Sequence, residues 1–366
     1  MTSPARHTLP GPDYYDDAVY QVERTRIFNR SWFYACRADR ISEAGQWVTV
    51  DVAGESVFVM RGDDGELRGF YNVCRHRGSQ LCDGASGQTK GVIMCPYHAW
   101  CYDLTGKLVA TPRVGADEVD RDALSLWPVH VDQWQGFVFV NLDRETPAPL
   151  RESLGAQYDE PLSFERFDLA GLRVGHMTES TIAANWKIAI ENYSECLHCP
   201  TVHPELIEAV PAYRTGWVFD DNRTDGGVAL ATGGNSYSAD PNKRLTPLST
   251  MTEEEASSVY GASIFPNMFL DIAGGSAVAT CLIPEGPTQT RVVTEYLFLP
   301  EDMARDDFDA SPVIDFCELV AGQDYTVCER VQRGVQSRAF THGVYPAKDE
   351  YVYQFNQRYL ARRDGS

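Results

Sequence analysis

Two short segments of the chain combine cysteine and histidine at spacings that suit a metal cluster. Cys74 and His76 are separated by one residue, and Cys95 and His98 are separated by two. Thiolates stabilise ferric iron, whereas neutral imidazoles make a cluster less negative and raise its reduction potential. Two thiolates on one iron and two imidazoles on the other form the ligand set of a Rieske [2Fe–2S] centre. The spacing therefore predicts such a cluster at these four residues.

A Cys₂His₂ zinc site is the main alternative for the same four side chains. Zinc fingers usually pair Cys with Cys and His with His, whereas each segment here mixes the two types. Four unrelated buried residues would need both spacings to arise by chance. We therefore favour the Rieske cluster and keep zinc as the alternative.

The segment before a second group of histidines has the pattern of a helix. Trp186, Ile190, Tyr193 and Leu197 recur at helical spacing, and core packing is the simplest explanation of this apolar stripe. We expect Pro200 to disturb the helix, because proline lacks a backbone N–H and clashes with the preceding turn.

Glu195, His198 and His203 lie near the end of this predicted helix. Glu195 and His198 are three residues apart, which would place them on one helix face. Both histidines could reach one metal ion around a helix end, and a carboxylate would complete a 2-His-1-carboxylate triad with open positions for O₂ on Fe(II). Two hydrogen-bonded surface histidines are the alternative. The Rieske signature favours the metal site, because a cluster needs somewhere to deliver electrons.

The ten cysteines are expected to be reduced thiols or metal ligands, since they are a small fraction of a long chain. Cys196 and Cys199 could suggest zinc binding or redox chemistry. Nothing else nearby completes a thiolate site, so we interpret these two as packing residues.

Composition favours a cytoplasmic enzyme. With 366 residues the chain can form two or three domains. Its net charge of −20 argues against nucleic-acid binding, which needs clustered Lys and Arg. Residues 1–12 lack the apolar core of a signal peptide, and no apolar run approaches the length of a membrane span. We therefore expect no membrane association.

Three stretches differ in pattern. Residues 1–44 form an N-terminal helical segment, residues 45–148 are rich in short β-branched and aromatic runs, and residues 149–366 mix helix and strand. Short β-branched or aromatic runs predict strands at residues 47–50, 56–60 and 69–73, and residues 136–141 form the clearest predicted strand. The fold class is therefore α+β: a small antiparallel β-sandwich whose loops carry both Cys/His segments, followed by a larger α+β domain.

With both motifs in this order, the chain resembles the α subunit of a Rieske non-haem iron oxygenase over nearly its whole length. The resemblance implies that residues 45–148 form the Rieske domain. It also implies that residues 149–366 form a catalytic domain with a helix-covered antiparallel sheet, on which residues 1–44 pack. By the same resemblance, the chain would hold two cofactors. A [2Fe–2S] cluster would be bound by Cys74, His76, Cys95 and His98, and a mononuclear Fe(II) by His198 and His203.

The family's third iron ligand is an Asp on a helix far downstream, and Asp324 is the best match. Asp315, Glu318 and Glu329 are the fallbacks. In the family, a carboxylate just before the first histidine bridges the two metal sites across neighbouring subunits of a homotrimer. The residue at that position here is Glu195.

Most ring-hydroxylating members have Asp at that position. A Glu within Glu-Cys-Leu-His-Cys resembles the branch that acts on glycine betaine, carnitine, stachydrine and choline, and residues 328–334 and 343–345 resemble that branch as well. The resemblance implies N-demethylation of a quaternary ammonium compound with O₂. The chain has no Gly-x-Gly-x-x-Gly fingerprint in a strand context, so a separate NAD(P)H-dependent reductase, with flavin and iron–sulfur groups, is implied.

Aromatic side chains after the histidines could surround a quaternary ammonium group by cation–π contact, although most aromatics in such a stretch belong to the core. The candidates are Tyr213, Trp217, Phe219, Tyr260, Phe265 and Phe269. Arg214 or Arg223 could pair with a substrate carboxylate, with a solvated surface position as the alternative.

Two other functions remain open. One is an oxygenase of an aromatic or other hydrophobic substrate, which a pocket lined by aliphatic residues would favour. The other is a Rieske electron carrier, against which the second histidine group and the length of the remaining chain argue.

Overall fold

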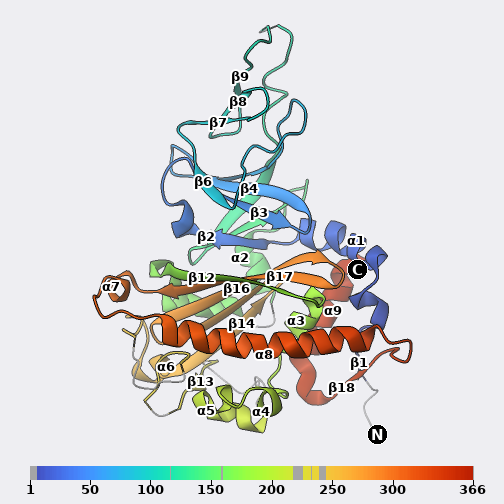
Figure 1. The fold of residues 1–366 in the computed structure, drawn as a ribbon, viewed down its shortest axis with the longest axis vertical. Helices are drawn as coiled ribbons and strands as arrows, with labels where there is room; N and C mark the ends of the chain where they lie inside the picture. The colour runs from blue at the N-terminus through green and yellow to red at the C-terminus, as the bar shows by residue number, and fades with distance from the viewer. Residues whose placement is uncertain are drawn as a thin grey trace. The chain divides into compact units, whose positions relative to one another are not determined.

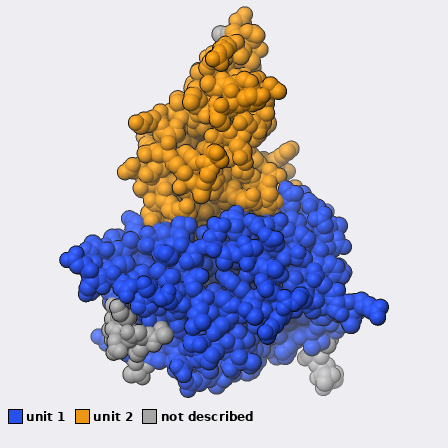
Figure 2. Space-filling view, viewed as in Figure 1, with its two compact units in different colours: residues 1–27, 154–366 blue, residues 28–153 orange. Residues whose placement is uncertain are grey.

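The chain divides into two compact units. The computed structural model describes residues 6–115, 117–157, 160–216, 226–231, 233–238 and 245–365. The larger unit comprises residues 1–27 and 154–366, and the smaller unit comprises residues 28–153 (Figure 2). These boundaries differ from the expected limits at residues 44 and 148. The smaller unit begins at Phe28, before the expected limit at residue 44, because strand β2 (Phe33–Arg37) pairs with β11 (Phe137–Asn141).

The smaller unit contains two antiparallel sheets. One has seven strands in the order β2-β11-β10-β5-β4-β3-β6, and the other has three in the order β7-β8-β9. Besides β2 and β11, the strands are β3 (Gln46–Val52), β4 (Glu55–Arg61), β5 (Leu67–Tyr71), β6 (Ser86–Gln88), β7 (Val92–Met94), β8 (Cys101–Asp103), β9 (Leu108–Ala110) and β10 (Pro128–Trp134). The predicted antiparallel β-rich unit is confirmed.

Local sequence explains the clearest hairpin of this unit. Gln135 and Gly136 both have positive φ, at 50° and 79°, between the paired residues Trp134 and Phe137. A two-residue turn of this kind matches the twist of the strands that it joins. All five residues of β11 are buried, so its continuous apolar run forms part of the core.

The larger unit is built on a six-stranded antiparallel sheet in the order β12-β17-β16-β15-β14-β13. Its strands are β12 (Arg173–Ile182), β13 (Val228–Ala229), β14 (Ser258–Ile264), β15 (Met268–Ala273), β16 (Ser276–Gly286) and β17 (Gln289–Phe298), and a separate pair joins β1 (Arg6–His7) to β18 (Val344–Tyr345). The α-helices are α1 (Asp17–Arg26), α2 (Leu150–Gly155, across the unit boundary), α3 (Trp186–Tyr193), α4 (Cys199–Val202), α5 (Leu206–Ala209), α6 (Glu253–Ala256), α7 (Pro300–Met303), α8 (Ser311–Val335) and α9 (Glu350–Asp364). No helix in the described part of the chain is both long and apolar enough to cross a bilayer.

Helix α8 runs across one face of this sheet (Figure 1). Its buried Val313 packs with Val278 and Tyr296, and its Phe316 packs in a second cluster with Val259. Burying this apolar stripe fixes the helix along the sheet. The helix-covered antiparallel sheet expected for this part of the chain is therefore confirmed.

A buried ion pair ties the N-terminal helix to the rest of the larger unit. Glu23 of α1 accepts hydrogen bonds from the Trp186 indole (2.9 Å) and the Tyr359 hydroxyl (2.9 Å), and it forms an ion pair with Lys187. Glu23 and Lys187 are both fully buried. Their charges depend on each other, because an unpaired charge in this interior would be strongly destabilising.

Replacement of Glu23 with Gln should therefore lower the free energy of unfolding by about 3–5 kcal/mol, since Lys187 would keep a buried charge without its partner. Urea denaturation followed by circular dichroism measures the loss. Asp17→Asn, an exposed change on the same helix, is the matched control. The double variant Glu23→Gln/Lys187→Met should recover part of the stability, and equal stability of Glu23→Gln and Asp17→Asn would contradict the prediction.

Candidate metal centres and pocket

Two tight turns of the smaller unit carry the first group of candidate ligands. The Gly78 N–H donates to the Cys74 carbonyl (3.1 Å), and the Ala99 N–H donates to the Cys95 carbonyl (3.0 Å). Gly78 and Ala99 both have a left-handed backbone, with φ of 74° and 56°. Each turn therefore begins at a cysteine and presents its histidine within a few residues.

The structure brings all four predicted ligands together. The rings of His76 and His98 lie 4.6 Å apart between centroids, and both cysteines belong to the hydrophobic core of the unit. Burial raises the pKa of Cys74, and the nearby Cys95 thiol raises it further. Two buried sulfurs and two more exposed imidazoles fit a cluster with one iron inside and the other facing solvent. The same donors also suit zinc, so geometry alone leaves that alternative open.

Two aromatic residues that we did not predict support this group. The Tyr102 hydroxyl lies 3.3 Å from the Cys74 sulfur and accepts a hydrogen bond from the Arg75 N–H (3.1 Å). The Trp100 ring stacks on the His76 ring, with centroids 4.6 Å apart and planes 7° apart. Both residues follow His98 closely in the sequence, so proximity was the signal that could have identified them.

The second group of candidate ligands converges on one carboxylate oxygen. Asp324 Oδ1 lies 2.9 Å from His203 Nε2 and 3.3 Å from His198 Nε2. The two imidazole rings lie 5.2 Å apart between centroids. Asp324 comes from α8, whereas the histidines come from the segment after α3. Of the predicted carboxylates, Asp324 is thus the one that contacts both histidines. Glu318 instead accepts hydrogen bonds from Thr178 and Tyr296, and Glu329 accepts one from Ala183 N–H.

The other nitrogen of each histidine is held from outside the group. His198 Nδ1 lies 2.6 Å from Glu195 Oε1, and His203 Nδ1 lies 2.7 Å from Gln323 Oε1. The Gln323 amide is itself oriented, because its nitrogen donates to Glu205 (2.9 Å). Such partners fix the ring orientation and leave Nε2 as the atom available to a metal. Sequence reasoning missed Gln323 and Glu205, although Gln323 is adjacent to Asp324.

The electrostatics of this group favour a positive charge at its centre. Burial alone would lower the pKa of His198, but the hydrogen bonds to Asp324 and Glu195 outweigh it and raise that pKa to about 9. Burial would raise the pKa of Asp324, yet the two histidines hold it below its usual value. Two imidazoles and one carboxylate, with both Nε2 atoms directed at the same oxygen, fit the 2-His-1-carboxylate set for Fe(II).

The predicted helix through Glu195 and His198 was wrong. Helix α3 ends at Tyr193, and residues 195–198 lie outside any helix. The Glu195 carboxylate accepts the backbone N–H groups of Leu197 and His198, which gives the chain a local alternative to helical bonds. Pro200 lies in the first turn of the short helix α4, where its missing N–H costs nothing.

The interpretation of Cys196 and Cys199 as packing residues also needs correction. The two sulfurs form a disulfide that encloses Leu197 and His198. The sulfur of Cys199 lies 3.9 Å from His198 Nε2, but as part of a disulfide it is not a thiolate ligand. Spacing alone did not reveal the bond, since the same spacing is common in reduced thiol pairs.

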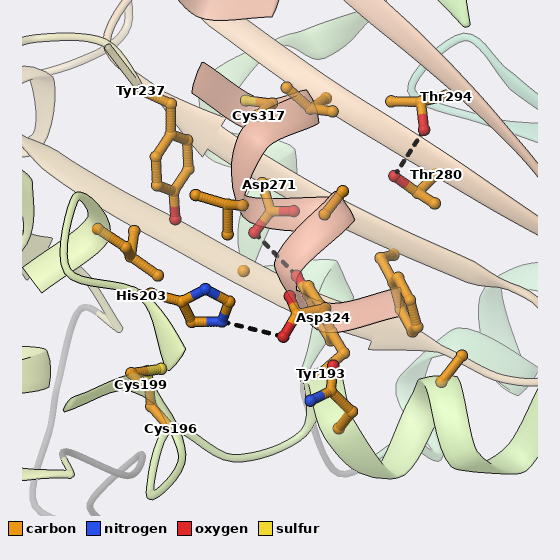
Figure 3. A pocket seen from close by; sticks show the side chains of 18 of the residues that line it. Tyr193, Cys196, Cys199, His203, Tyr237, Asp271, Thr280, Thr294, Cys317 and Asp324 are labelled. Carbon is orange, nitrogen blue, oxygen red and sulfur yellow. Dashed lines mark hydrogen bonds and ion pairs between the residues drawn. A yellow bond between two sulfur atoms is a disulfide. The ribbon is translucent and has the colours of Figure 1, made fainter. Parts of the chain in front are cut away.

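A pocket of about 220 Å³ opens onto the histidines and Asp324 (Figure 3). Sheet residues line one part of it and α8 another. Of the predicted aromatics, Tyr213 and Phe269 line the pocket, whereas Tyr260 packs on Phe167 and Phe265 packs near Phe355. Five lining aromatics were not predicted as such: Tyr193, Tyr237, Tyr296, Phe316 and Tyr325.

The remaining predicted side chains do not reach the pocket or are not described. Arg214 is exposed and donates to the Ile207 carbonyl (3.1 Å). It therefore occupies the solvated surface position that was the alternative to substrate binding. Trp217, Phe219 and Arg223 lie outside the described residues.

Comparison with known protein families identifies a domain around each group of candidate ligands. Residues 31–130 match the Rieske [2Fe-2S] domain, and residues 169–365 match the catalytic domain of the ring hydroxylating alpha subunit. The first match covers Cys74, His76, Cys95 and His98 and favours an iron–sulfur cluster over zinc there. The second covers His198, His203 and Asp324.

Two relatives and two solved structures illustrate the similarity. The glycine betaine monooxygenase oxygenase subunit of Chromohalobacter salexigens is 30% identical, over 94% of this chain and 83% of the relative. The carnitine monooxygenase oxygenase subunit of Acinetobacter pittii is 29% identical, over 91% and 86%. A solved quaternary ammonium Rieske monooxygenase superposes with a TM-score of 0.80 at 25% identity, over 98% and 96% of the two chains. Naphthalene 1,2-dioxygenase from Rhodococcus sp. shares the fold, with a TM-score of 0.73 at 20% identity, over 97% and 94%.

Tyr102→Phe should lower the reduction potential of the iron–sulfur cluster, because a hydroxyl near a cluster sulfur stabilises the more negative reduced state. One hydrogen bond of about 1 kcal/mol corresponds to roughly 40 mV for a one-electron couple. Spectroelectrochemical titration measures the potential. Tyr71→Phe, a half-buried tyrosine of β5, is the matched control, and equal potentials in the two variants would contradict the role of Tyr102.

Gln323→Leu should weaken Fe(II) binding by about 10–100-fold, since His203 would lose the partner that orients its ring. Anaerobic iron titration with a competing chelator measures the affinity. Gln336→Leu is the same change at an exposed position at the end of α8 and should bind iron normally. The role of Gln323 would be refuted if both variants bound iron equally, while an unchanged cluster spectrum in both would verify that the smaller unit is intact.

Proposed function

The chain belongs to the family of Rieske non-haem iron oxygenase α subunits, and we propose that it removes an N-methyl group from a quaternary ammonium compound. As a member of this family it is an oxidoreductase that uses a Rieske [2Fe–2S] cluster, a mononuclear iron, O₂ and a small-molecule substrate. Cys74, His76, Cys95 and His98 would hold the cluster, and His198, His203 and Asp324 would hold the iron.

The observation that carries the proposal is an aromatic pocket next to the two histidines. The rings of Tyr193 and Phe269 stack at 4.0 Å with planes 6° apart, and Tyr213 and Tyr237 line the same cavity. A quaternary ammonium group cannot donate a hydrogen bond and is held instead by aromatic faces. The names of the glycine betaine, carnitine and choline monooxygenases among the relatives support the same substrate class.

The overall reaction balances as a monooxygenation. The substrate R–N(CH₃)₃⁺, O₂, two electrons and two protons yield R–N(CH₃)₂, formaldehyde, water and one proton. One oxygen atom replaces a C–H bond of the methyl group by C–OH, and the other leaves as water. The resulting hemiaminal loses its C–N bond, and the nitrogen keeps the electron pair. When bound, the cluster supplies single electrons and the iron supplies the site of O₂ reduction.

The residues of this chain would position the reactants. Glu195 and Gln323 hold the Nδ1 atoms, so both Nε2 atoms stay directed at Asp324 Oδ1. The aliphatic part of the pocket lining, which includes Val278, Leu282 and Val292, would exclude water around the methyl group. An outer face of the Tyr193–Phe269 stack would contact the ammonium group.

We further propose that electrons come from a separate NAD(P)H-dependent reductase with flavin and iron–sulfur groups. Glu195 would bridge a Rieske histidine of one subunit and His198 of the next in a homotrimer. Its side chain keeps 17% of its surface exposed beside His198, which supports a second contact from another chain. We retain the expected cytoplasmic location as a proposal.

Oxidation of an aromatic or other hydrophobic substrate is the second candidate. The specific observation in its favour is the aliphatic part of the pocket lining, formed by residues such as Val278, Leu282 and Val292. The two candidates differ in whether formaldehyde is released.

Formaldehyde release tests the proposal directly. The anaerobically prepared protein, loaded with Fe(II), would receive NADH, a surrogate reductase and one substrate at a time, with O₂ uptake recorded in parallel. The panel is glycine betaine, stachydrine, carnitine and choline, with benzoate-type acids as comparison. We expect formaldehyde in proportion to O₂ for at least one ammonium compound.

His198→Ala is the control for the iron site. Turnover should be lost because one of the three iron ligands is missing, while the absorption spectrum of the cluster should survive. Turnover that persists in this variant would refute the assignment of His198. Substrate-dependent O₂ uptake without formaldehyde, found with the acids and not with the ammonium compounds, would favour the second candidate instead.

A further inference from the structure

Acidic side chains outnumber basic ones in the described lining of the pocket. Its described lining contains four carboxylates, Glu195, Asp271, Glu318 and Asp324, and no Lys or Arg. The two basic side chains are His198 and His203, which belong with Asp324 to the iron site. Within the described residues, a substrate carboxylate therefore finds no cationic side chain, whereas a cation finds several anions.

Asp271 is the carboxylate that the iron site does not explain. It lies on β15, between Gly261 of β14 and Val278 of β16. Among the described residues, the Tyr193 hydroxyl is the sole hydrogen-bond donor to its side chain, at 2.9 Å (Figure 3). Asp271 is half-buried, and a carboxylate that is partly removed from water is costly unless it is paired. A single neutral donor compensates its charge incompletely.

Glu318 is the informative contrast. Its Oε1 receives the Thr178 hydroxyl at 2.7 Å and the Tyr296 hydroxyl at 2.6 Å. This carboxylate therefore already has two donors from the sheet. Asp271, with one, retains acceptor capacity for a ligand.

The surroundings of Asp271 suit an organic cation. Tyr193, which donates to it, is the residue whose ring stacks on Phe269. Burial raises the pKa of Tyr237, and the nearby Asp271 charge raises it further. Gly261 leaves space here, because a Cβ at that position would come within 3.1 Å of Asp271 Oδ1 and 2.9 Å of the Tyr193 hydroxyl. A carboxylate beside aromatic faces combines charge pairing with cation–π attraction.

We propose that Asp271 binds the cationic nitrogen of the substrate, and that this chain selects ammonium compounds whose remainder is neutral over betaines, which carry a carboxylate. The inference rests on the proposed function and narrows its substrate class. A trimethylammonium alcohol such as choline has the required chemistry. A betaine would bring its own carboxylate into a pocket that already holds unpaired negative charge.

The protonation of Asp271 gives a second test, the pH dependence of ligand affinity, which needs no variant. Burial raises the pKa of Asp271 to about 7, and the Tyr193 hydrogen bond opposes that rise. The other titratable groups near it are Tyr193 of α3, Tyr237, and Cys317 of α8, with His203 and Asp324 across the cavity (Figure 3). Burial raises the pKa of Tyr237 and of Cys317, so both stay neutral near pH 7.

Choline does not titrate in this range. Its affinity should fall as the pH is lowered from about 8 to about 6, because protonated Asp271 has no charge to offer.

Calorimetric titration of the iron-loaded protein under anaerobic conditions, without reductant, tests the proposal. Three ligands form a matched set: choline, glycine betaine, and 3,3-dimethylbutan-1-ol, in which carbon replaces the charged nitrogen of choline. We expect choline to bind at least about tenfold more tightly than either of the others. Asp271→Asn keeps the size of the side chain and an acceptor for Tyr193. It should weaken choline binding by about tenfold or more, remove the dependence on pH and leave the neutral alcohol unchanged.

Asp307→Asn removes one exposed negative charge and is the matched control, with choline binding as in the unaltered protein. Tighter binding of glycine betaine than of choline would overturn the inference. So would an Asp271→Asn variant that weakens choline and the neutral alcohol equally, since that result indicates a structural role. If Asp271→Asn does not fold, choline affinity that is independent of pH in the unaltered protein overturns the inference by itself.

The outcomes also separate this inference from the proposed function. Formaldehyde from glycine betaine, together with its tighter binding, would uphold N-demethylation and reject the selection by Asp271. Failure of every ammonium compound to bind or to be oxidised would reject both.

Discussion

The iron site of the larger unit depends on one carboxylate oxygen that contacts two imidazoles. Asp324 Oδ1 contacts Nε2 of both His198 and His203, although His203 lies 121 residues earlier in the chain. Neither partner can set this geometry alone. The apolar face of α8 must first be buried on the sheet, and that packing then places Asp324 opposite the segment that follows α3. The site is thus a consequence of helix-on-sheet packing.

The histidines need additional support because they do not lie within a regular helix. Glu195 holds His198 and also accepts the backbone N–H groups of its own turn, while the disulfide Cys196–Cys199 restricts the same short loop. His203 is held by Gln323, which comes from the helix that supplies Asp324. Irregular backbone permits two imidazoles to point at one atom, and these outside partners offset the freedom that the irregular backbone would otherwise leave.

The regular elements and the ligand types could be predicted from the sequence, whereas the irregular segment could not. Short spacings reveal Cys74, His76, Cys95 and His98, because ligands on a tight turn remain close in the chain. Asp324 required a resemblance, since no local pattern links it to histidines so far upstream. The helix predicted through Glu195 failed because a side-chain carboxylate competes with the backbone for the same N–H groups, and hydrophobic periodicity does not register that competition.

The pocket aromatics show a similar limit. Tyr193 belongs to the apolar stripe of α3, and the stripe correctly indicated packing, but the last residue of a helix can serve both the core and a cavity. Tyr260 and Phe265 are aromatic residues close to Phe269 in the chain, yet Tyr260 packs on Phe167 and Phe265 packs near Phe355. Which face of a strand looks into a cavity depends on register, and register is fixed by pairing rather than by residue type.

Charge accounting connects the iron site with the rest of the cavity. Two neutral imidazoles, one carboxylate and a divalent ion leave about one net positive charge, which Glu195 beside His198 can balance. The iron site then contributes little net field to the cavity, and the sign of the potential that a substrate meets is set by the carboxylates that remain. Of these, Glu318 has two hydroxyl donors and Asp271 has one. An incompletely compensated charge acts most strongly where water is excluded. Asp271 of β15 can therefore influence which ligands bind in the pocket, although the iron ligands lie on other elements.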